Sequence, residues 1–435
     1  MTLPQTLPDW LARLESLHPK GQAGIELGLE RLLKVKAALG QTQPCPVITV
    51  GGTNGKGSTC AYLESILLAT GYRVGVYTSP HLWDYNERVR INAQPVDDAI
   101  LCAAFARVET ARHSAGDIAL TYFEFGTLAA WEVFAASGVE AVVLEVGLGG
   151  RLDAVNAYDP DVAIVTAIDL DHTEWLGPTR EHIGFEKAGI FRAGKPAFCA
   201  DPTPPQRLLD HAAAIGADLH LLGRDFGFQR DLENRLQWRW WCRVGATTVR
   251  RSLAYPGLRG AVQLFNAAVA LAALESIADR LPVTMQAIRE GLIATELPGR
   301  FQVLPGKPAI VLDVGHNPQA LRILAENLGN MGFFDRTHAV VGMLADKDMA
   351  GTLSALKGKV DCWYAASLPG PRGSSAAQLT DVIREQDLGG EVAEFASADE
   401  AMRSALGSAG ESDRILAFGS FYTVAGVREA LKTRR

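Results

Sequence analysis

Val47-Ile-Thr-Val-Gly-Gly-Thr-Asn-Gly-Lys-Gly-Ser-Thr59 is the stretch of sequence from which the fold can be worked out. Its first four residues are apolar or β-branched and predict a buried strand, small residues follow, and Lys56 opens a segment with helical spacing. Glycines let backbone N–H groups point inward, a helix N-terminus is partially positive, and the lysine adds a full positive charge. The stretch therefore predicts a nucleoside triphosphate site.

This loop departs from the two standard glycine patterns. Val50 stands where a strict P-loop has its first glycine, and Gly57 follows the lysine where a serine or threonine is usual. A dinucleotide fingerprint would need a glycine at Cys60. A plain glycine turn in an α/β protein is the alternative interpretation.

Composition limits the classes of protein to consider. With 435 residues the chain exceeds what one core usually supports, so we expect two domains. The balance of 42 Lys+Arg against 49 Asp+Glu gives a net charge of -7, which offers no general attraction to nucleic acid or to acidic membranes. The six cysteines form no metal or redox spacing, and the N-terminus has no signal-peptide pattern. We expect a cytoplasmic protein with no nucleic-acid or membrane partner.

Apolar strands alternate with helices after the loop, which predicts a mostly parallel sheet covered by helices, with ligands at the carboxyl ends of its strands. Residues 226–255 interrupt this alternation and predict an inserted antiparallel ribbon, whose Trp238, Trp240 and Trp241 either cover a sheet face or stack on bases. The expected segments are 74–78, 99–112, 127–136, 141–146, 162–168 and 197–200, then helices 261–278 and 284–294.

Pro298 and Gly299 predict a hinge, after which a second series of strands begins. The fold class we predict is α/β: a P-loop-containing, mostly parallel sheet domain over residues 1–298 with a β-ribbon insertion, and a smaller Rossmann-like domain over residues 299–435. The second domain has no glycine-rich loop, so we expect it to close over the first domain's site. Its expected strands are 310–314, 339–344, 362–367, 392–395 and 415–418.

Three strand ends of the first domain carry groups suited to a magnesium nucleotide. Ser79 follows one strand, Glu145 ends another, and His172 follows a third. Magnesium prefers hard oxygen ligands, so a carboxylate, a hydroxyl and phosphates suffice, and the imidazole fits less well. Each residue has a structural alternative: a turn at Ser79, an ion pair between Glu145 and Arg151, and a capping contact of His172 with a neighbouring aspartate.

The second domain offers two further groups. Asp313 ends a strand and begins Asp-Val-Gly-His-Asn-Pro, and Arg300 lies at the hinge. A guanidinium there could reach the oxygens of a transferred phosphoryl group, whereas a surface ion pair is the structural alternative.

Together these motifs resemble the folylpolyglutamate synthase family of the Mur ligase-like superfamily, and within it the bacterial bifunctional members that are also dihydrofolate synthases. The resemblance spans almost the whole chain and rests on the order of the motifs. They are Gly52–Ser58, Thr78–Leu82 with Glu87-Arg88, Thr121–Glu124, Glu145–Ala154, Asp171-His172, Glu186–Ile190 and Asp313–Pro318.

The resemblance implies an ATP-dependent ligase that adds L-glutamate to dihydropteroate and to reduced folates through an acyl phosphate. It implies two Mg²⁺ ions, the first held by Ser79 and Glu145 and the second by His172. It also implies a monomer whose partners are its small-molecule substrates. The expected triphosphate and nucleotide contacts are Gly52, Thr53, Asn54, Gly55, Lys56, Gly57, Ser58, Thr59, Asn266, Arg300 and Asp313. The expected pterin contacts are Ile25, Glu26, Leu27, Gly28, Thr121, Tyr122, Phe123, Glu124, Leu152, Asp153 and Ala154; His316 and Ser420 lie in the expected glutamate region. Lys56, Lys187, Arg300 and His316 are the expected catalytic residues.

Lys187 matches a lysine that is carbamylated in relatives, where it supports the second metal. An ammonium beside Mg²⁺ would be repelled and a carbamate attracted, so the position makes electrostatic sense only for a modified lysine or one turned away. The alternative is a surface lysine on a helix over residues 181–191.

Two other functions are compatible with the motifs. A muramyl-type ligase uses the same chemistry on a cell-wall nucleotide, but the resembling enzymes usually lack Gly57 and carry a further domain. A non-catalytic nucleotide-binding switch is the second alternative.

Overall fold

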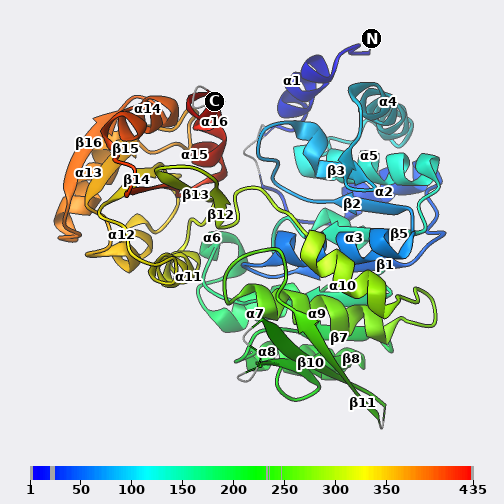
Figure 1. Cartoon of the computed structure of the whole chain (residues 1–435). Helices are drawn as coiled ribbons and strands as arrows, with labels where there is room; N and C mark the ends of the chain where they lie inside the picture. Colours follow the sequence, from blue (N-terminus) through cyan, green and yellow to red (C-terminus); the bar gives the residue numbers. More distant parts are fainter. Residues whose placement is uncertain (1–2, 20–24, 232–233, 235, 246, 433–435) are drawn as a thin grey trace. The chain divides into compact units, whose positions relative to one another are not determined.

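The computed structural model describes residues 3–19, 25–231, 234, 236–245 and 247–432. The chain folds into two compact units: unit 1 comprises Met1–Gly257 and Gln263–Thr295, and unit 2 comprises Leu258–Val262 and Glu296–Arg435. Both units are helices packed on a mostly parallel sheet, so the predicted fold class is confirmed (Figure 1). Unit 1 ends at Thr295 and unit 2 continues from Glu296, close to the predicted domain boundary between residues 298 and 299. The short segment Leu258–Val262 also belongs to unit 2. The domain boundary stays a prediction.

Unit 1 is built on an eight-stranded sheet with the order β4-β3-β2-β5-β1-β6-β7-β8. Strands β2, β5, β1, β6, β7 and β8 run parallel, and β3 and β4 form an antiparallel edge that the sequence did not predict. The strands are β1 (Val47–Gly51), β2 (Val74–Tyr77), β3 (Val89–Ile91), β4 (Gln94–Pro95), β5 (Ala141–Glu145), β6 (Val162–Val165), β7 (Pro196–Cys199) and β8 (Asp218–Leu221).

The central strands of this sheet are buried throughout, because helices cover both faces of the sheet. Helices α9 and α10 both pack on α3 over one face, and residues of the remaining long helices form a single hydrophobic core with the other face. The helices are α1 (Leu7–Leu17), α2 (Glu30–Leu39), α3 (Lys56–Thr70), α4 (Asp98–Ser114), α5 (Tyr122–Ser137), α6 (Thr173–Leu176), α7 (Arg180–Ala188), α8 (Gln206–Ile215), α9 (Gln263–Ser276) and α10 (Met285–Ala294), with short 3-10 turns at Tyr85–Arg88 and Ala154–Ala157.

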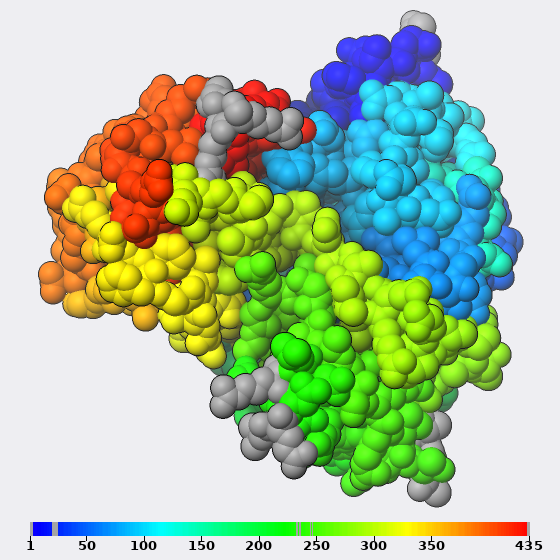
Figure 2. All heavy atoms as spheres, viewed as in Figure 1, coloured from blue at the N-terminus to red at the C-terminus, as the bar shows by residue number. Residues whose placement is uncertain are grey.

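Helix boundaries follow local capping signals. Helix α5 begins five residues before the predicted segment, because Thr121 and Glu124 cap its first turn reciprocally. Helix α7 ends at Ala188, three residues before the predicted end. The amphipathic helix α1 buries Leu7, Trp10 and Leu14, and in the space-filling view its dark-blue atoms lie against the cyan atoms of α4 (Figure 2).

The ribbon predicted near residues 226–255 is a three-stranded antiparallel sheet of β9 (Phe226–Arg230), β10 (Gln237–Val244) and β11 (Thr247–Ala254). Trp238 and Trp240 are fully buried, and the Trp240 indole N–H donates to the carbonyl of Ala268 in α9 at 3.0 Å. Covering a sheet face is therefore the confirmed role of these two tryptophans.

Unit 2 contains a six-stranded sheet with the order β12-β13-β17-β14-β15-β16, parallel except for β12. Helices α11, α12 and α13 form its hydrophobic core, and α14 packs on β14 and β15. The strands are β12 (Gln302–Leu304), β13 (Ala309–Asp313), β14 (Thr337–Val341), β15 (Cys362–Ala366), β16 (Glu391–Phe395) and β17 (Arg414–Phe418), and the helices are α11 (Pro318–Gly329), α12 (Met349–Leu353), α13 (Ala376–Glu385), α14 (Ala398–Ser408), α15 (Phe421–Gly426) and α16 (Arg428–Lys432), with a 3-10 turn at Ser354–Leu356.

Across the part of the chain that the structure describes, no helix is both long enough and apolar enough to cross a lipid bilayer.

Candidate functional site

The carboxyl ends of four neighbouring strands in unit 1 bring the predicted phosphate and metal residues to one edge of the sheet. Strands β2, β5, β1 and β6 are adjacent and parallel, and the register pairs Val50 with Glu145 and Tyr77 with Leu144. The phosphate loop follows β1, Ser79 follows β2, Glu145 is the last residue of β5, and His172 lies beyond β6. Polar groups from four separate segments therefore meet at the sheet edge where α/β proteins bind ligands.

The phosphate loop fits so closely against its neighbours that two of its glycines cannot be replaced without strain. Gly52 has φ +141°, and a Cβ there would lie 1.8 Å from the Thr166 hydroxyl. Gly55 has φ +92°, and its Cβ would lie 2.5 Å from Oδ1 of Asn266. A positive φ and a close approach both demand glycine, so these two residues determine the path of the loop backbone.

Lys56 is the first residue of α3 and folds back over the loop. Its Nζ donates to the carbonyls of Gly52 at 2.9 Å and Thr53 at 3.2 Å. The N–H groups of Lys56, Gly57 and Ser58 belong to the first turn of α3, where N–H groups have no partner within the helix. A helix start, a lysine and inward glycines form a site for an anion.

The remaining loop side chains are held within unit 1. The Thr59 hydroxyl donates to the Gly55 carbonyl at 3.0 Å, and Ser58 accepts from Gln263 at 3.4 Å. The Thr53 hydroxyl donates to the carbonyl of Asp169 at 3.1 Å, and the Asn54 carbonyl accepts from the Thr166 hydroxyl at 2.7 Å. Sequence reasoning missed the supporting roles of Thr166 and Gln263. The position of the Thr166 hydroxyl directly after β6 is the signal that could have identified the first of these residues.

Glu145 and Ser79 are brought together by their strands. The backbone N–H of Ser79 donates to Oε2 of Glu145 at 3.1 Å, and Glu145 is buried with 6% of its surface exposed. The suggested ion pair between Glu145 and Arg151 is wrong, because Arg151 pairs with Glu186 at 2.9 Å. A buried carboxylate beside a hydroxyl-bearing loop offers the hard oxygen ligands that suit magnesium.

His172 has φ +51° and stands immediately before α6. Its Nε2 lies 3.9 Å from Oδ1 of Asp171, and its backbone N–H donates to the same oxygen at 2.9 Å. The suggested contact with a neighbouring aspartate therefore exists. The described residues contain no cluster of three or more His, Cys, Asp or Glu side chains arranged for a metal.

Lys187 is buried on α7 with only 4% of its surface exposed, so the alternative of a surface lysine is wrong. Burial, helped by the charge of Lys56, lowers the pKa of the Lys187 amine to about 7, although Asp171 and Asp153 favour its charged form. Burial also raises the pKa of Asp153 to about 7, against hydrogen bonds from backbone N–H groups that include Leu148. Both groups lie where charge is costly, which is typical of functional sites.

The three segments predicted to bind a pterin lie together in unit 1. The backbone N–H of Gly28 donates to the carbonyl of Leu152 at 3.3 Å, which joins Ile25–Gly28 to Leu152–Ala154. Thr121 and Glu124 cap α5 at its first turn, and Phe123 packs so closely on Gly147 that a Cβ there would lie 2.7 Å from its ring.

The predicted residues of unit 2 gather at the carboxyl ends of β13 and β17, which pair Asp313 with Phe418. Asp313 accepts from the backbone N–H groups of Phe301 at 2.8 Å and Gly315 at 2.7 Å, and burial raises its pKa. The Arg300 guanidinium lies 4.9 Å from the centre of the Phe421 ring.

His316 and Ser420 occupy the loops that follow these two strands. Nδ1 of His316 lies 2.9 Å from the Val314 carbonyl, and Ser420 caps α15 by accepting from the Thr423 N–H at 3.0 Å. Unit 2 therefore presents an arginine, a carboxylate, an imidazole and a hydroxyl at one edge of its sheet.

A glycine loop with a lysine at the edge of a parallel sheet is typical of nucleotide-binding enzymes, and the domains that the chain matches place it in the Mur ligase class of ATP-dependent ligases. The chain matches the Mur ligase middle domain over residues 50–223 and the Mur ligase, glutamate ligase domain over residues 299–421. The dihydrofolate synthase/folylpolyglutamate synthase of Escherichia coli (strain K12) is 47% identical over 430 residues, covering 99% of this chain and 96% of the relative. The chain belongs to the dihydrofolate synthase/folylpolyglutamate synthase family.

Two solved structures of this family are similar over the full length. The Escherichia coli FolC in complex with DHPP and ADP has a TM-score of 0.91 and 45% identity, and covers 100% of both chains. A bifunctional folylpolyglutamate synthase/dihydrofolate synthase with Mn, AMPPNP and L-glutamate bound has a TM-score of 0.88 and 46% identity, with 99% of this chain and 100% of that chain covered.

Proposed function

We propose that the chain joins L-glutamate to dihydropteroate and to reduced folates, with ATP as the source of energy. One observation carries the proposal: the lysine-bearing phosphate loop and the Glu145 carboxylate end adjacent strands of one sheet, in a chain whose relatives of almost equal length carry these two activities in their names. The reaction has two steps, activation of a carboxylate and capture by an amine.

Activation requires two anions to approach each other. A carboxylate oxygen of the folate precursor attacks the γ-phosphorus of ATP, the bond from that phosphorus to the ADP oxygen breaks, and an acyl phosphate forms. The loop from Gly52 to Thr59 holds the triphosphate with backbone N–H groups, and Lys56 turns from its carbonyl partners toward the phosphate oxygens. This charge compensation lowers the barrier because it is arranged before the anions meet.

Capture releases the phosphate. The neutral amine of L-glutamate attacks the acyl carbon, an amide bond forms, the bond to the phosphate oxygen breaks, and the amine loses a proton. We assign Asn266, Arg300 and Asp313 to the nucleotide, and His316 and Ser420 to glutamate. Ile25–Gly28, Thr121–Glu124 and Leu152–Ala154 are assigned to the pterin, because the partly buried Phe123 offers a flat apolar surface there.

The residues present fit a divalent metal. Glu145 and Ser79 supply a carboxylate and a hydroxyl at one edge of the sheet, and His172 with Lys187 would hold a second ion if the lysine is carbamylated. Magnesium bound there would neutralise phosphate oxygens. A buried amine with a pKa near 7 is neutral often enough to react with carbon dioxide, which supports the modification. The proposal of a monomer rests on the resemblance to the family, and that of a cytoplasmic location rests on the sequence.

The test is phosphate release from ATP measured in parallel with three acceptors: dihydropteroate, tetrahydrofolate and a muramyl nucleotide. We expect glutamate-dependent release with the first two and none with the third. Activity on tetrahydrofolate alone would leave only the polyglutamylating role, and activity on the muramyl nucleotide alone would overturn the proposal. ATP binding without turnover on any acceptor would favour a switch.

A further inference from the structure

The segment Ile25–Gly28 has neither helix nor strand structure, so side-chain contacts determine where it lies. Its backbone is joined to Leu152 by the Gly28 N–H. Its one charged side chain, Glu26, has Oε2 3.4 Å from Nε2 of His18 and forms an ion pair with Arg31. A short irregular segment of this kind keeps one conformation only where several such contacts act together.

The Arg31 guanidinium connects this segment to the start of α5. Its Nη1 contacts the Glu26 carboxylate, and its Nη2 donates to the Glu26 carbonyl at 3.0 Å and to Oε1 of Glu124 at 3.0 Å. The other oxygen of Glu124 accepts from the backbone N–H of Thr121 at 2.8 Å. One guanidinium therefore fixes the positions of two chain segments 93 residues apart in the sequence.

The contacts of Arg31 are sheltered from solvent on the α5 side. The Glu124 side chain is 4% exposed and that of Arg31 is 26% exposed, so the pair is only partly screened by water. A guanidinium suits this task because its donors lie in one rigid plane and can serve three acceptors at once, which an ammonium cannot do with the same geometry.

We propose that Arg31 is a positioning residue for the pterin half of the acid substrate: it holds Ile25–Gly28 against Thr121–Glu124 and so sets the walls between which the pterin binds. This inference rests on the proposed function, which assigns both segments to the pterin. Arg31 itself touches neither ATP nor glutamate in this scheme. Loss of its contacts should therefore weaken binding of the pteroate acid selectively.

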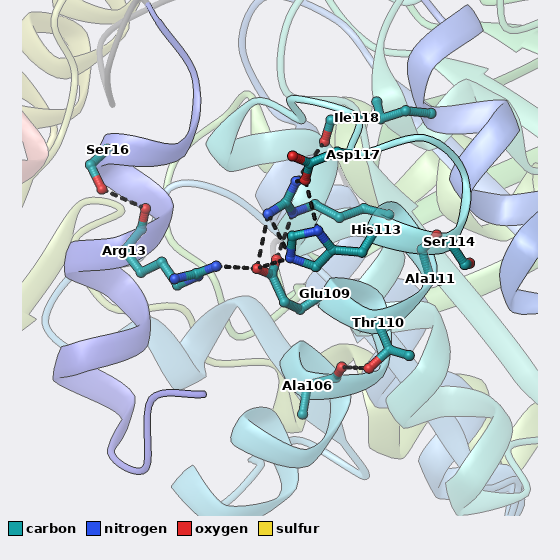
Figure 3. A network of polar contacts seen from close by, with 11 residues as sticks. Arg13, Ser16, Ala106, Glu109, Thr110, Ala111, His113, Ser114, Asp117 and Ile118 are labelled. Carbon is teal, nitrogen blue, oxygen red and sulfur yellow. Dashed lines mark hydrogen bonds and ion pairs between the residues drawn. The ribbon is translucent and has the colours of Figure 1, made fainter. Parts of the chain in front are cut away.

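Arg13 provides a matched control on the N-terminal arm, the name used here for α1, α2 and the residues 25–29 that precede α2. It pairs with Glu109 of α4 (Figure 3). The exposed fractions of these two side chains, 24% and 1%, are close to the 26% and 4% of Arg31 and Glu124. Arg13 anchors α1 and contacts no residue of the segments assigned to the pterin. Arg13→Gln thus removes an equally sheltered arginine from the arm without touching Ile25–Gly28.

The experiment compares wild type, Arg31→Gln, Arg31→Lys and Arg13→Gln. KM is measured for dihydropteroate and for ATP, and dihydropteroate binding in the presence of ADP is measured by calorimetry. We expect Arg31→Gln to raise the KM and the Kd for dihydropteroate about 10-fold or more, with the KM for ATP changed less than about 2-fold. Arg31→Lys should fall between, and Arg13→Gln should lower the melting temperature without changing either constant.

Unchanged dihydropteroate constants in Arg31→Gln, or an equal rise of the KM for ATP, would overturn the inference. An equal rise in Arg13→Gln would do the same, since it would show that any damage to the arm has this effect. If Arg31→Gln does not fold, Arg31→Lys decides, because unaltered constants there also contradict the proposal. Inactivity of the wild type with dihydropteroate would instead count against the proposed function, before any variant is compared.

Discussion

Arg90 and Glu64 form a buried ion pair in which Nη2 lies 2.8 Å from Oε2, and it fastens β3 to the helix that begins at Lys56. Arg90 also donates to the Thr78 hydroxyl at 3.0 Å, one residue before Ser79. The helix of the phosphate loop and the loop of a proposed metal ligand are therefore held by the same guanidinium.

Breaking this pair from one side should be costly. We expect Arg90→Met to lower the free energy of unfolding by about 3–5 kcal/mol, because the Glu64 carboxylate would stay buried without its cation. Urea unfolding monitored by circular dichroism measures the change.

A double variant supplies the control for this prediction. Arg90→Met combined with Glu64→Leu should recover much of the lost stability, since an apolar pair of similar volume costs little. If the double variant is as unstable as Arg90→Met, packing and the hydrogen bond to Thr78 account for the loss, and the ion-pair explanation is wrong.

Replacing Lys56 should remove turnover and spare the fold. Among the residues that the structure describes, its Nζ donates to two loop carbonyls alone, so Lys56→Met should change the melting temperature little, while glutamate-dependent phosphate release should fall about 1,000-fold. Lys195→Met is the control, because Lys195 pairs with Asp161 just before β6, at the opposite end of the sheet. Retained turnover in Lys56→Met would contradict the assignment of the loop.

Arg300 should matter for catalysis more than for folding. Its guanidinium lies over the Phe421 ring, and we expect Arg300→Ala to lower kcat about 100-fold or more with little loss of stability. Arg414 of the same unit lies 5.2 Å from the Phe334 ring and also donates to the carbonyl of Leu328 at 2.7 Å. Arg414→Ala should therefore lose stability and keep kcat; the reverse pattern would make Arg300 a structural residue.

The sequence predicted the local part of this structure well. The strand, glycine loop and helix at Val47–Thr59 could be predicted because each residue type acts through its own backbone preference. The burial of Trp238 and Trp240 followed from the alternation of apolar and polar residues in a ribbon that contains no basic run. Periodicity alone thus predicts the succession of strands and helices along the chain, but it does not predict the order of the strands within each sheet.

The parts that the sequence did not predict depend on distant contacts. The edge strands β3 and β4 are three and two residues long, too short for a pattern to stand out. The closeness of Thr166 to Gly52 and of Arg31 to Glu124 exists only once the sheet has formed. The burial of Lys187 was missed for the same reason, because it depends on α7 packing against the loop at Gly150.

Glu109 should make stability sensitive to acid. Arg13 points its guanidinium at the Glu109 carboxylate (Figure 3). Burial raises the pKa of this carboxyl, but hydrogen bonds from Arg112 and Arg13 outweigh burial and hold the pKa below the ordinary value of 4.5. The ionised form therefore stabilises the fold above its unfolded-state pKa, and this contribution is lost as the pH falls through the folded-state pKa. Glu109→Gln should lower the free energy of unfolding at neutral pH by about 3–5 kcal/mol.

The pH dependence of unfolding distinguishes this from a packing effect. Below about pH 4.5 the stability of the wild type should fall more steeply than that of Glu109→Gln, which has no proton to gain at this position. Asp117→Asn is the control, because Asp117 is 70% exposed and its pair with Arg112 should contribute less than about 1 kcal/mol. Parallel acid curves for wild type and Glu109→Gln would contradict the prediction.

Lys187 should carry a carbamate when carbon dioxide is present. Burial lowers the pKa of its amine to about 7, so the neutral amine that attacks carbon dioxide, forming a C–N bond and losing a proton, increases as the pH rises through that value. Carbon-13 NMR of the intact protein with labelled bicarbonate and Mg-ADP should show a carbamate signal that grows between about pH 6 and pH 8. Lys36→Met is the control, because burial also lowers the pKa of the Lys36 amine. The Lys36 Nζ already donates to the Ala157 carbonyl at 2.6 Å, so we expect no carbamate on Lys36 and an unchanged signal in Lys36→Met. Lys187→Met should abolish it, and a signal that survives in Lys187→Met would place the modification elsewhere and remove the proposed partner of His172.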